Sequence, residues 1–320
     1  MSKVELGIQN GSTIYYPPVE AGIGWETERK GVPGKLSFTV KNETNLNFQE
    51  GNSVMLKVDG KKLFYGFVFQ KKRDKEQLIN VTAYDQLRYF KNKDTYVYSN
   101  KRLDELVRMI ATDFRLQTGT LENTGYKISS RVEDNKTLFD IVQTAVDITL
   151  QDTKRMFVLY DEYGKLTLKN VESMKLNLLI DEETGENFDY TSTIDGETYN
   201  KIKLAYDNKD TGKREIYIAQ DSKNMNSWGV LQFFEKIDEK VNGKAKANSL
   251  LQLYNKKTRN LSIKKAFGDT RVRSGCAVVV KLNLGDVNVM NYMMVEKVKH
   301  TFEENQHYMD LTLRGGEFIG

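Results

Sequence analysis

The sequence predicts a mainly β protein with an α+β insert, in which two similar small antiparallel β-barrels flank a mixed α/β middle domain. Three observations predict this fold class. Closely spaced alternating strands open the chain, amphipathic helices follow them, and a strand motif that begins near residue 51 returns near residue 275. At 320 residues the chain is long enough for such an arrangement.

The first barrel is expected at residues 1–98. Val54, Leu56 and Val58 alternate with other residues, which predicts a strand with one buried face. Asp59-Gly60 supplies a two-residue hairpin turn, and the run KLFYGFVF after it predicts the returning strand. Closely spaced antiparallel strands of this kind are typical of a small barrel or sandwich.

The middle domain is expected at residues 99–197. Apolar residues recur there at helical spacing, which predicts two amphipathic helices. They are Leu103, Leu106, Val107, Ile110, Ala111 and Phe114 in the first helix, and Leu138, Ile141, Val142, Ala145 and Ile148 in the second. The run FVLYDEYGKLTLK then predicts a hairpin with glycine in its turn.

The second barrel is expected at residues 198–320. Strands around Ile202 and Ile216 open it, and a helix is expected near residues 244–256. The repeated motif follows this helix and leads to the last strand of the chain.

The repeat organises the whole prediction. Gly51, Val54, Leu56, Lys57 and Val58 match, in order, Gly275, Val278, Val280, Lys281 and Leu282. Farther along, the alignment places Val68 on Val298, Val81 on Leu311 and Ala83 on Leu313. We therefore expect the two segments to superpose as duplicated barrels.

Composition limits the class of protein. Hydrophobic residues make up 39% and charged residues 29%, which is ordinary for a soluble globular chain. The sequence lacks an apolar run long enough to span a membrane, and its N-terminus lacks a signal-peptide pattern. Cys276 is the only cysteine, which suits synthesis in a reducing cytoplasm, and its apolar neighbours favour a small buried residue over a reactive thiol.

Charge is unevenly distributed, although the net charge is only +4. Residues 240–273 contain ten Lys or Arg and one acid, whereas residues 181–197 contain seven acids and no base. The basic stretch at 240–273 is a candidate protein interface. We expect it to contact an acidic surface, such as the 181–197 segment of a neighbouring subunit. Its residues are Lys264, Lys265, Arg271 and Arg273. A solvated surface without any partner is the alternative.

Motifs that would carry chemistry are lacking in the sequence. Its two histidines, His300 and His307, do not have the spacing of a zinc site. A serine nucleophile elbow is absent, and the glycine-rich stretches do not join a strand to a helix as phosphate-binding loops do. Nothing selects a catalytic pair among the 44 acids. The sequence predicts no catalytic residue, no metal ligand and no cofactor.

Four stretches, in order along nearly the whole chain, carry a resemblance. They are LFYGFVF with INVTAYDQLRYF (63–90), WGVLQFFEKID (228–238), AFGDTRVRSGCAVVV (266–280) and MMVEKVKHTFEENQHYMDLTL (293–313). Together they resemble the baseplate hub proteins of contractile phage tails. The nearest group is the XkdQ/YqbQ type, found in phage-like elements and tail-derived bacteriocins of Gram-positive bacteria.

The resemblance implies a structural, non-enzymatic role. It implies a homotrimer whose two barrels per subunit form a pseudo-sixfold ring that adapts the hexameric tail tube to the trimeric spike and nucleates tube assembly. The implied partners are further copies of the chain, the spike protein and tail tube or tube-initiator proteins. The tape measure protein is a further candidate in the channel, whereas a membrane or a specific nucleic acid is not expected.

The same resemblance places the protein in an assembled phage tail or in a DNA-free bacteriocin particle, after synthesis in the bacterial cytoplasm. His300 matches a histidine of the family, and we interpret it as a hydrogen-bonded structural residue.

Two other classes of function stay open. A cell-wall hydrolase component of a tail would need an acid pair or zinc ligands in a cleft. A nucleic-acid-binding barrel would combine the basic stretch with stacking aromatic residues. Successive strand residues face opposite sides, however, so Lys264 and Lys265 are not expected to line one groove.

Overall fold

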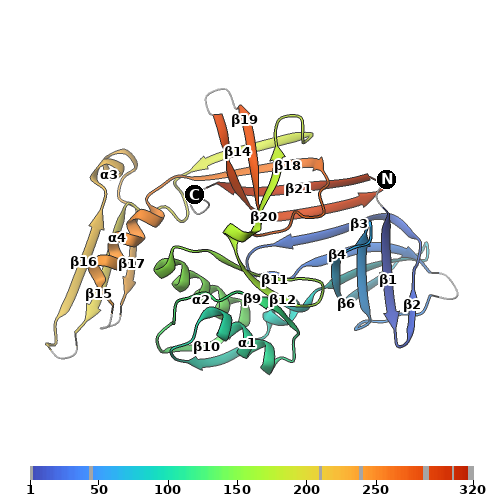
Figure 1. Cartoon of the computed structure of the whole chain (residues 1–320), viewed down its shortest axis with the longest axis horizontal. Helices are drawn as coiled ribbons and strands as arrows, with labels where there is room; N and C mark the ends of the chain where they lie inside the picture. The colour runs from blue at the N-terminus through green and yellow to red at the C-terminus, as the bar shows by residue number, and fades with distance from the viewer. Residues whose placement is uncertain are drawn as a thin grey trace. The chain divides into compact units, whose positions relative to one another are not determined.

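The computed structural model describes residues 3–42, 46–208, 211–237, 241–283, 288–304 and 306–315. The chain forms two compact units, one made of Met1–Asp189 with Leu261–Gly320 and one made of Tyr190–Asn260 (Figure 1). A sheet of 13 strands runs through the first unit. Mostly β structure with a few helices confirms the predicted fold class. Among the described residues the strand pairings do not close a sheet on itself, so barrel closure stays a prediction.

The N-terminal strands pair antiparallel in the order β3-β4-β7-β6-β5-β1-β2. They are β1 (Val4–Asn10), β2 (Thr13–Tyr15), β3 (Val19–Glu28), β4 (Lys35–Lys41), β5 (Ser53–Val58), β6 (Lys61–Arg73) and β7 (Leu78–Tyr84). Alternation produces a buried face, on which Val54, Leu56 and Val58 are fully enclosed. Asp59 and Gly60 have positive φ angles of 50° and 75°, as the tight turn between β5 and β6 requires.

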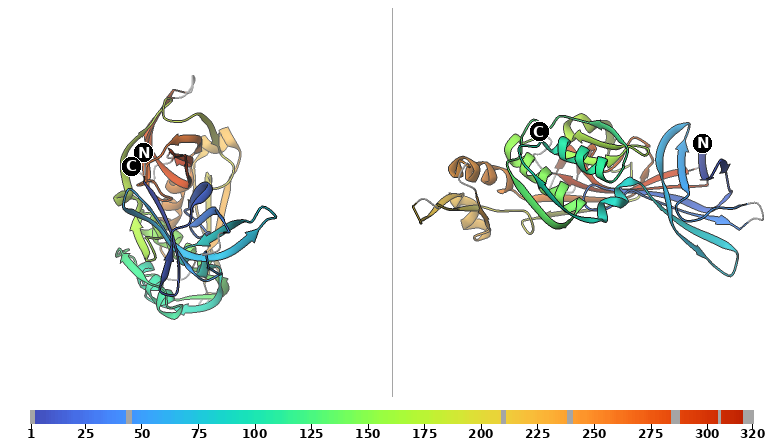
Figure 2. Two further views of the ribbon diagram at one scale, coloured as in Figure 1. Left: turned by 90° about the vertical axis from the view of Figure 1, so that its right-hand side faces the viewer. Right: turned by 90° about the horizontal axis from the view of Figure 1, so that it is seen from below.

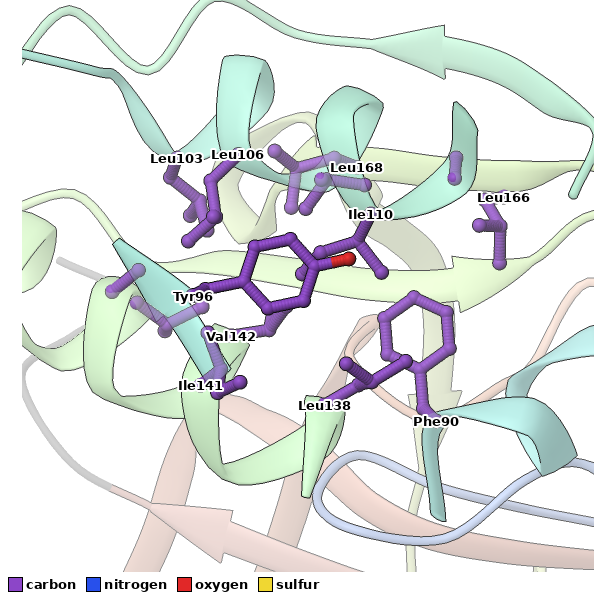
Figure 3. Packing of buried hydrophobic residues seen from close by; sticks show 14 of the residues in the cluster. Phe90, Tyr96, Leu103, Leu106, Ile110, Leu138, Ile141, Val142, Leu166 and Leu168 are labelled. Carbon is purple, nitrogen blue, oxygen red and sulfur yellow. The ribbon is translucent and has the colours of Figure 1, made fainter. Parts of the chain in front are cut away.

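The segment that follows has a core of its own. Its elements are η1 (Gln86–Lys91), β8 (Lys93–Tyr98), α1 (Leu103–Asp113), β9 (Thr118–Leu121), β10 (Arg131–Thr137), α2 (Leu138–Thr153), β11 (Phe157–Asp161), β12 (Leu166–Asn170) and η2 (Val171–Met174). Figure 3 shows Leu106 and Ile110 of α1 directed toward Ile141 of α2, with Tyr96 of β8 among them. The helical stripes expected from the sequence are therefore confirmed as the two packing faces.

The C-terminal strands complete the large sheet. They are β13 (Lys175–Ile180), β14 (Asn187–Thr193), β18 (Thr258–Phe267), β19 (Ala277–Asn283), β20 (Asn288–Glu303) and β21 (Gln306–Gly315). Strands β13 and β14 come from the segment expected as the middle domain, yet they pair with β19 and β18. Periodicity identifies a strand but not its partner, which explains why the sequence did not assign them here.

The second unit has a separate three-stranded sheet. Its elements are β15 (Lys201–Asp207), β16 (Arg214–Gln220), α3 (Ser222–Trp228), β17 (Gln232–Lys236) and α4 (Gly243–Tyr254). Ala247 and Leu250 of α4 pack on Ile202 and Leu204 of β15. The strands expected to open the second barrel therefore pair with one another instead of with the repeated motif. The domain limits at residues 98 and 197 remain a prediction.

Two halves of the large sheet repeat one strand order. The N-terminal half runs β3-β4-β7-β6-β5-β1, and the C-terminal half runs β14-β18-β21-β20-β19-β13. Each half contains a meander of three consecutive antiparallel strands, β5-β6-β7 in the N-terminal half and β19-β20-β21 in the C-terminal half. The halves differ at one end, because β1 is antiparallel to β5 whereas β13 is parallel to β19.

The repeated motif begins with the same local geometry in both halves. Gly51 and Gly275 have φ angles of 87° and 88°. The amide of Gly51 donates to the carbonyl oxygen of Val68, and that of Gly275 donates to the carbonyl oxygen of Val295, both at 2.8 Å. Each of these valines is followed by a β-bulge.

The alignment of Val68 with Val298 is therefore wrong, and its structural counterpart is Val295. The facing residues agree with this correction, because Val68 pairs with Ala83 and Val295 pairs with Leu313. The bulge after Val295 interrupts the alternation, so Val295 and Val298 are both fully buried. Two buried valines flank one bulge, and the sequence alone does not distinguish them.

Candidate functional site

The predicted interface begins with Lys264 and Lys265 near the end of β18. Lys265 has a positive φ of 49°, which interrupts the pleat of the strand. Both lysine side chains are therefore exposed, at 64% each. Exposure of both side chains does not place them on one side of the strand, so the expectation that they do not line one groove stays a prediction.

Both lysines contact acids of their own chain. The Nζ of Lys264 lies 3.5 Å from Asp310, and the Nζ of Lys265 lies 3.1 Å from Glu186. Glu186 belongs to the acidic 181–197 segment, so the basic and acidic stretches meet within one chain. Exposed pairs of this kind contribute only about 0–1 kcal/mol each. A contact of these lysines with a neighbouring subunit remains a prediction.

Arg271 and Arg273 lie in very different surroundings. Arg271 is 52% exposed and donates from its Nε to Asp269 at 3.0 Å. The guanidinium of Arg273 is buried, stacks 3.7 Å from the centre of the Tyr160 ring, and donates from Nη2 to the carbonyl oxygen of Asp161 at 2.9 Å. Its buried Nε lacks a hydrogen-bond partner among the described residues. The guanidinium of Arg273 is therefore bound within its own chain, while the residue as a whole is partly buried.

Two buried carboxylates lie around Arg273. Asp85 accepts hydrogen bonds from the amides of Gly34 and Leu87 at 2.9 and 3.0 Å. Asp161 accepts from the amide of Gly164 at 2.6 Å and from Gln86 Nε2 at 3.2 Å. Burial raises the pKa of both carboxyls, and burial lowers the pKa of the Arg273 guanidinium.

This buried polar cluster joins three parts of the first unit. Asp85 follows β7, Asp161 ends β11, and Arg273 lies between β18 and β19. Its polar groups are bound mainly to backbone atoms of these connections, which fixes the connections against one another. Asp85 lies in the run INVTAYDQLRYF that carries part of the resemblance, whereas no local sequence motif marks Asp161 as a site residue.

The histidines form a second buried cluster. His300 is fully buried, stacks on Trp25 at 4.7 Å between ring centres, and donates from Nε2 to the carbonyl oxygen of Val272 at 2.9 Å. The Nδ1 of His300 lies 2.8 Å from the Nε2 of His307. When both rings are neutral, His307 donates its Nε2 proton to the Nδ1 of His300. Burial lowers the pKa of His300 to about 3 and that of His307 to about 4. These contacts agree with the interpretation of His300 as a hydrogen-bonded structural residue.

The described residues offer neither a metal site nor a reactive thiol. The described residues contain no cluster of three or more His, Cys, Asp or Glu that could hold a metal ion. Cys276 is buried as expected, and burial raises the pKa of its thiol to about 11, which disfavours the reactive thiolate. None of the described helices is long and apolar enough to cross a membrane.

Comparison with known proteins places these features in a family. The profile of the YqbQ-like family matches residues 23–314. The phage-like element PBSX protein XkdQ of Bacillus subtilis is 32% identical over 306 residues, which cover 92% of this chain and 91% of that protein.

Solved structures share the fold at much lower identity. The 43 kDa tail protein of prophage MuSo2 from Shewanella oneidensis has a TM-score of 0.71 at 10% identity, with 99% of this chain and 100% of that chain covered. The c3393 protein of E. coli, a type VI secretion component described as similar to T4 tail proteins gp27 and gp5, has a TM-score of 0.58 at 10% identity. The superposition covers 99% of this chain and 78% of the c3393 chain. The chain thus has the fold of prophage tail proteins, and it belongs to the YqbQ-like family.

Proposed function

We propose that the chain is the structural baseplate hub of a contractile tail. In this role it assembles as a homotrimer, and its two similar β-modules alternate around a pseudo-sixfold ring. The ring adapts the hexameric tail tube to the trimeric spike and nucleates assembly of the tube.

The duplicated strand order is the observation that carries this proposal. Three copies of a chain with two similar modules present six similar surfaces, so a threefold object can meet a sixfold one. The shared glycine turn and the shared bulge support a common origin of the modules beyond a general abundance of valine. Cyclic arrangements of identical chains are the common solution for closed assemblies.

The proposed partners follow from the same role. They are the trimeric spike, tail tube or tube-initiator proteins, and the tape measure protein in the channel. The protein is made in the bacterial cytoplasm and acts in an assembled phage tail or bacteriocin particle. A specific nucleic-acid partner is not proposed, because the basic residues of the predicted interface are paired with acids or buried.

The size of the modules is compatible with a channel. A domain of about 100 residues has a radius of gyration near 13 Å, hence a diameter of roughly 34 Å as a sphere. Six equal spheres in a ring enclose a hole of about the same diameter, which admits an extended chain or a duplex. A lining free of strong positive charge is expected if DNA passes, because lysine and arginine bind phosphates.

Lys264, Lys265 and Arg271 remain the proposed contact to an acidic partner surface, whereas Arg273 acts from inside its own chain. Reversing the charge of Lys264 and Lys265 should weaken assembly at low salt and have less effect at high salt, because screening already removes the attraction there. Assembly that is indifferent both to the substitutions and to salt removes this contact from the proposal.

We propose that the chain has no catalytic activity of its own. The alternative of a peptidoglycan hydrolase is best tested at a pocket of about 590 Å³ whose lining includes Glu20, Glu303 and Glu304. A zymogram of the purified chain should show no clearing. Clearing that disappears in Glu20→Gln or Glu303→Gln would establish the hydrolase instead.

Native mass measurement tests the proposed assembly. The chain has a mass of 36.9 kDa, and the expected species is three times that mass, alone or with spike and tube proteins. A chain that stays monomeric with all of these partners present contradicts the proposed function.

A further inference from the structure

The two β-modules of one chain are joined by a strand pairing. Strand β3 pairs antiparallel with β20, in a register from Glu28 opposite Lys297 to Ile23 opposite Phe302. This pairing uses the part of β20 that extends beyond β19, because β19 faces only the stretch up to Met294.

Ion pairs accompany this internal junction. Arg29 donates to both carboxylate oxygens of Glu296 at 2.8 Å. Lys297 lies 3.2 Å from Glu26 and 3.7 Å from Glu28. The pairs between the strands set two acids of β3 against Lys297 of β20, whereas Arg29, which directly follows β3, binds an acid of β20.

The equivalent surfaces exist a second time, and neither pairs with another strand in the described part of the chain. Strand β14 occupies the place of β3 in the C-terminal half, and it is the outermost strand beside β18 in the described sheet (Figure 1). Strand β6 occupies the place of β20, and its residues 70–73 extend beyond β5, whose pairing ends at Phe67. Figure 2 shows this end of β6 with β7 as a projecting hairpin.

The pairing with the next strand fixes this equivalence. Gln70 faces Thr82 and Lys72 faces Asn80, just as Lys297 faces Thr312 and Lys299 faces Asp310 after the same bulge. In β20 the edge opposite these contacts is the one that β3 occupies. In β6 the corresponding edge faces no described strand. An unpaired edge is a template for another strand.

The charges of the two edges are of opposite sign, as are those of Lys297 and its two acids in the internal junction. Residues 70–73 of β6 contribute exposed Lys72 and Arg73. Strand β14 contributes exposed Asp189 and directly follows the acidic residues at 182, 183 and 186. As for Lys297, the basic side chains belong to the strand after the bulge and the acidic ones to its proposed partner, whereas the Arg29–Glu296 pair has no counterpart at these edges.

We propose that β14 of one copy pairs antiparallel with residues 70–73 of β6 in the next copy, repeating between chains the β3–β20 junction found within each chain. This inference rests on the proposed trimer and specifies its subunit contact. Such a contact is head-to-tail, so it closes into a ring in which three internal and three intermolecular junctions alternate. Main-chain hydrogen bonds supply the attraction, and the charges favour the acidic edge over other strands.

Cysteine cross-linking in the assembled hub tests this contact. Lys72→Cys is combined in turn with Asn187→Cys, Asp189→Cys and Thr191→Cys, which sample alternate positions along β14. Mild oxidation should convert the trimer into covalently linked dimers and trimers for at least one combination. Lys62→Cys with the same β14 cysteines is the matched control, because β5 already pairs with that part of β6.

A charge exchange gives a second readout that does not depend on register. The substitutions Lys72→Glu and Arg73→Glu together should reduce the trimer fraction, and adding Asp189→Lys should restore part of it. These side chains are exposed, so the variants should fold as the original chain does.

The outcomes separate this contact from the proposed function. A trimer by mass that gives no more cross-linking than the Lys62→Cys control overturns the contact and leaves the hub proposal intact. Cross-links from β14 to an added spike or tube protein, in place of β6, also overturn it. A chain that stays monomeric with all partners contradicts both proposals.

Discussion

Arg273 shows how much a single residue's surroundings decide its role. Its place in the basic stretch predicts an interface residue, yet its guanidinium lies between the Tyr160 ring and the Asp161 carbonyl. Burial of a cation is costly unless hydrogen bonds and nearby opposite charge compensate it. Asp85 and Asp161 supply that charge, and they raise the otherwise lowered pKa of Arg273.

Replacing Arg273 should therefore affect folding far more than replacing its neighbour. Arg273→Met removes the charged donor to Asp161 and should lower the free energy of unfolding by about 1.5–3 kcal/mol. Arg271→Met removes an exposed pair with Asp269 and should cost about 0–1 kcal/mol. Urea unfolding of both variants measures the difference. Equal losses would contradict the structural role of Arg273.

The buried histidines predict a loss of stability in acid. An unfolded histidine has a pKa of about 6.5. The folded values of about 3 for His300 and about 4 for His307 are lower, because burial disfavours the charged rings. Below about pH 6.5 the unfolded chain takes up protons that the folded chain refuses, so the stability present at neutral pH declines toward pH 4.

Unfolding free energies at pH 7 and pH 5 test this linkage. His307→Gln removes one of the two groups and should show a smaller decline than the original chain. Asp269 and Asp59 oppose the effect of burial on His307 and are unchanged in this comparison. The same decline in both proteins would show that these histidines do not control it.

At the scale of elements, the two glycine turns offer a matched pair. Both glycines have φ near 88°, a region that other residues enter at a cost of about 1–3 kcal/mol. A Cβ at Gly51 meets nothing within 4 Å, whereas a Cβ at Gly275 lies 2.7 Å from Val158. Gly275→Ala should therefore destabilise the chain more than Gly51→Ala, by the added cost of displacing β11.

Thermal unfolding of the two glycine variants gives the comparison directly. An equal shift of the melting temperature would mean that Val158 yields without cost, and a larger shift for Gly51→Ala would contradict the packing described for Gly275.

The elements also show what the sequence could predict. The periodicity of hydrophobic residues identifies the β5–β6 hairpin and helices α1 and α2, because each of these is formed by contacts that are local in sequence. It did not place β14 beside β18 or separate β15 from the large sheet, because strand pairing across long stretches leaves no periodic signal. Sequence spacing aligns Gly51 with Gly275 correctly but aligns Val68 with Val298 instead of Val295, because residue types do not reveal a β-bulge.

For the candidate site the sequence was less informative. Lys264 and Lys265 are exposed as an interface requires, but the left-handed Lys265 could not be foreseen from residue type. The Asp85, Asp161 and Arg273 cluster brings together three connections that are far apart in the chain, so only the fold reveals it.

At the scale of the whole molecule, duplication is the central feature. One chain contains two modules with the same strand order, joined by β3 and β20, and leaves the corresponding edges of β14 and β6 without described partners. A structure with these properties is suited to closing a ring from a small number of copies. The proposed pseudo-sixfold hub therefore depends on this duplication.

End-on electron microscopy of the purified hub, assembled with its spike, tests that claim most directly. The expected averages show threefold symmetry with six densities of similar size at one radius around an open centre. Three densities, or six that lie at clearly different radii, would contradict the account, because the duplicated modules would then not alternate around one ring.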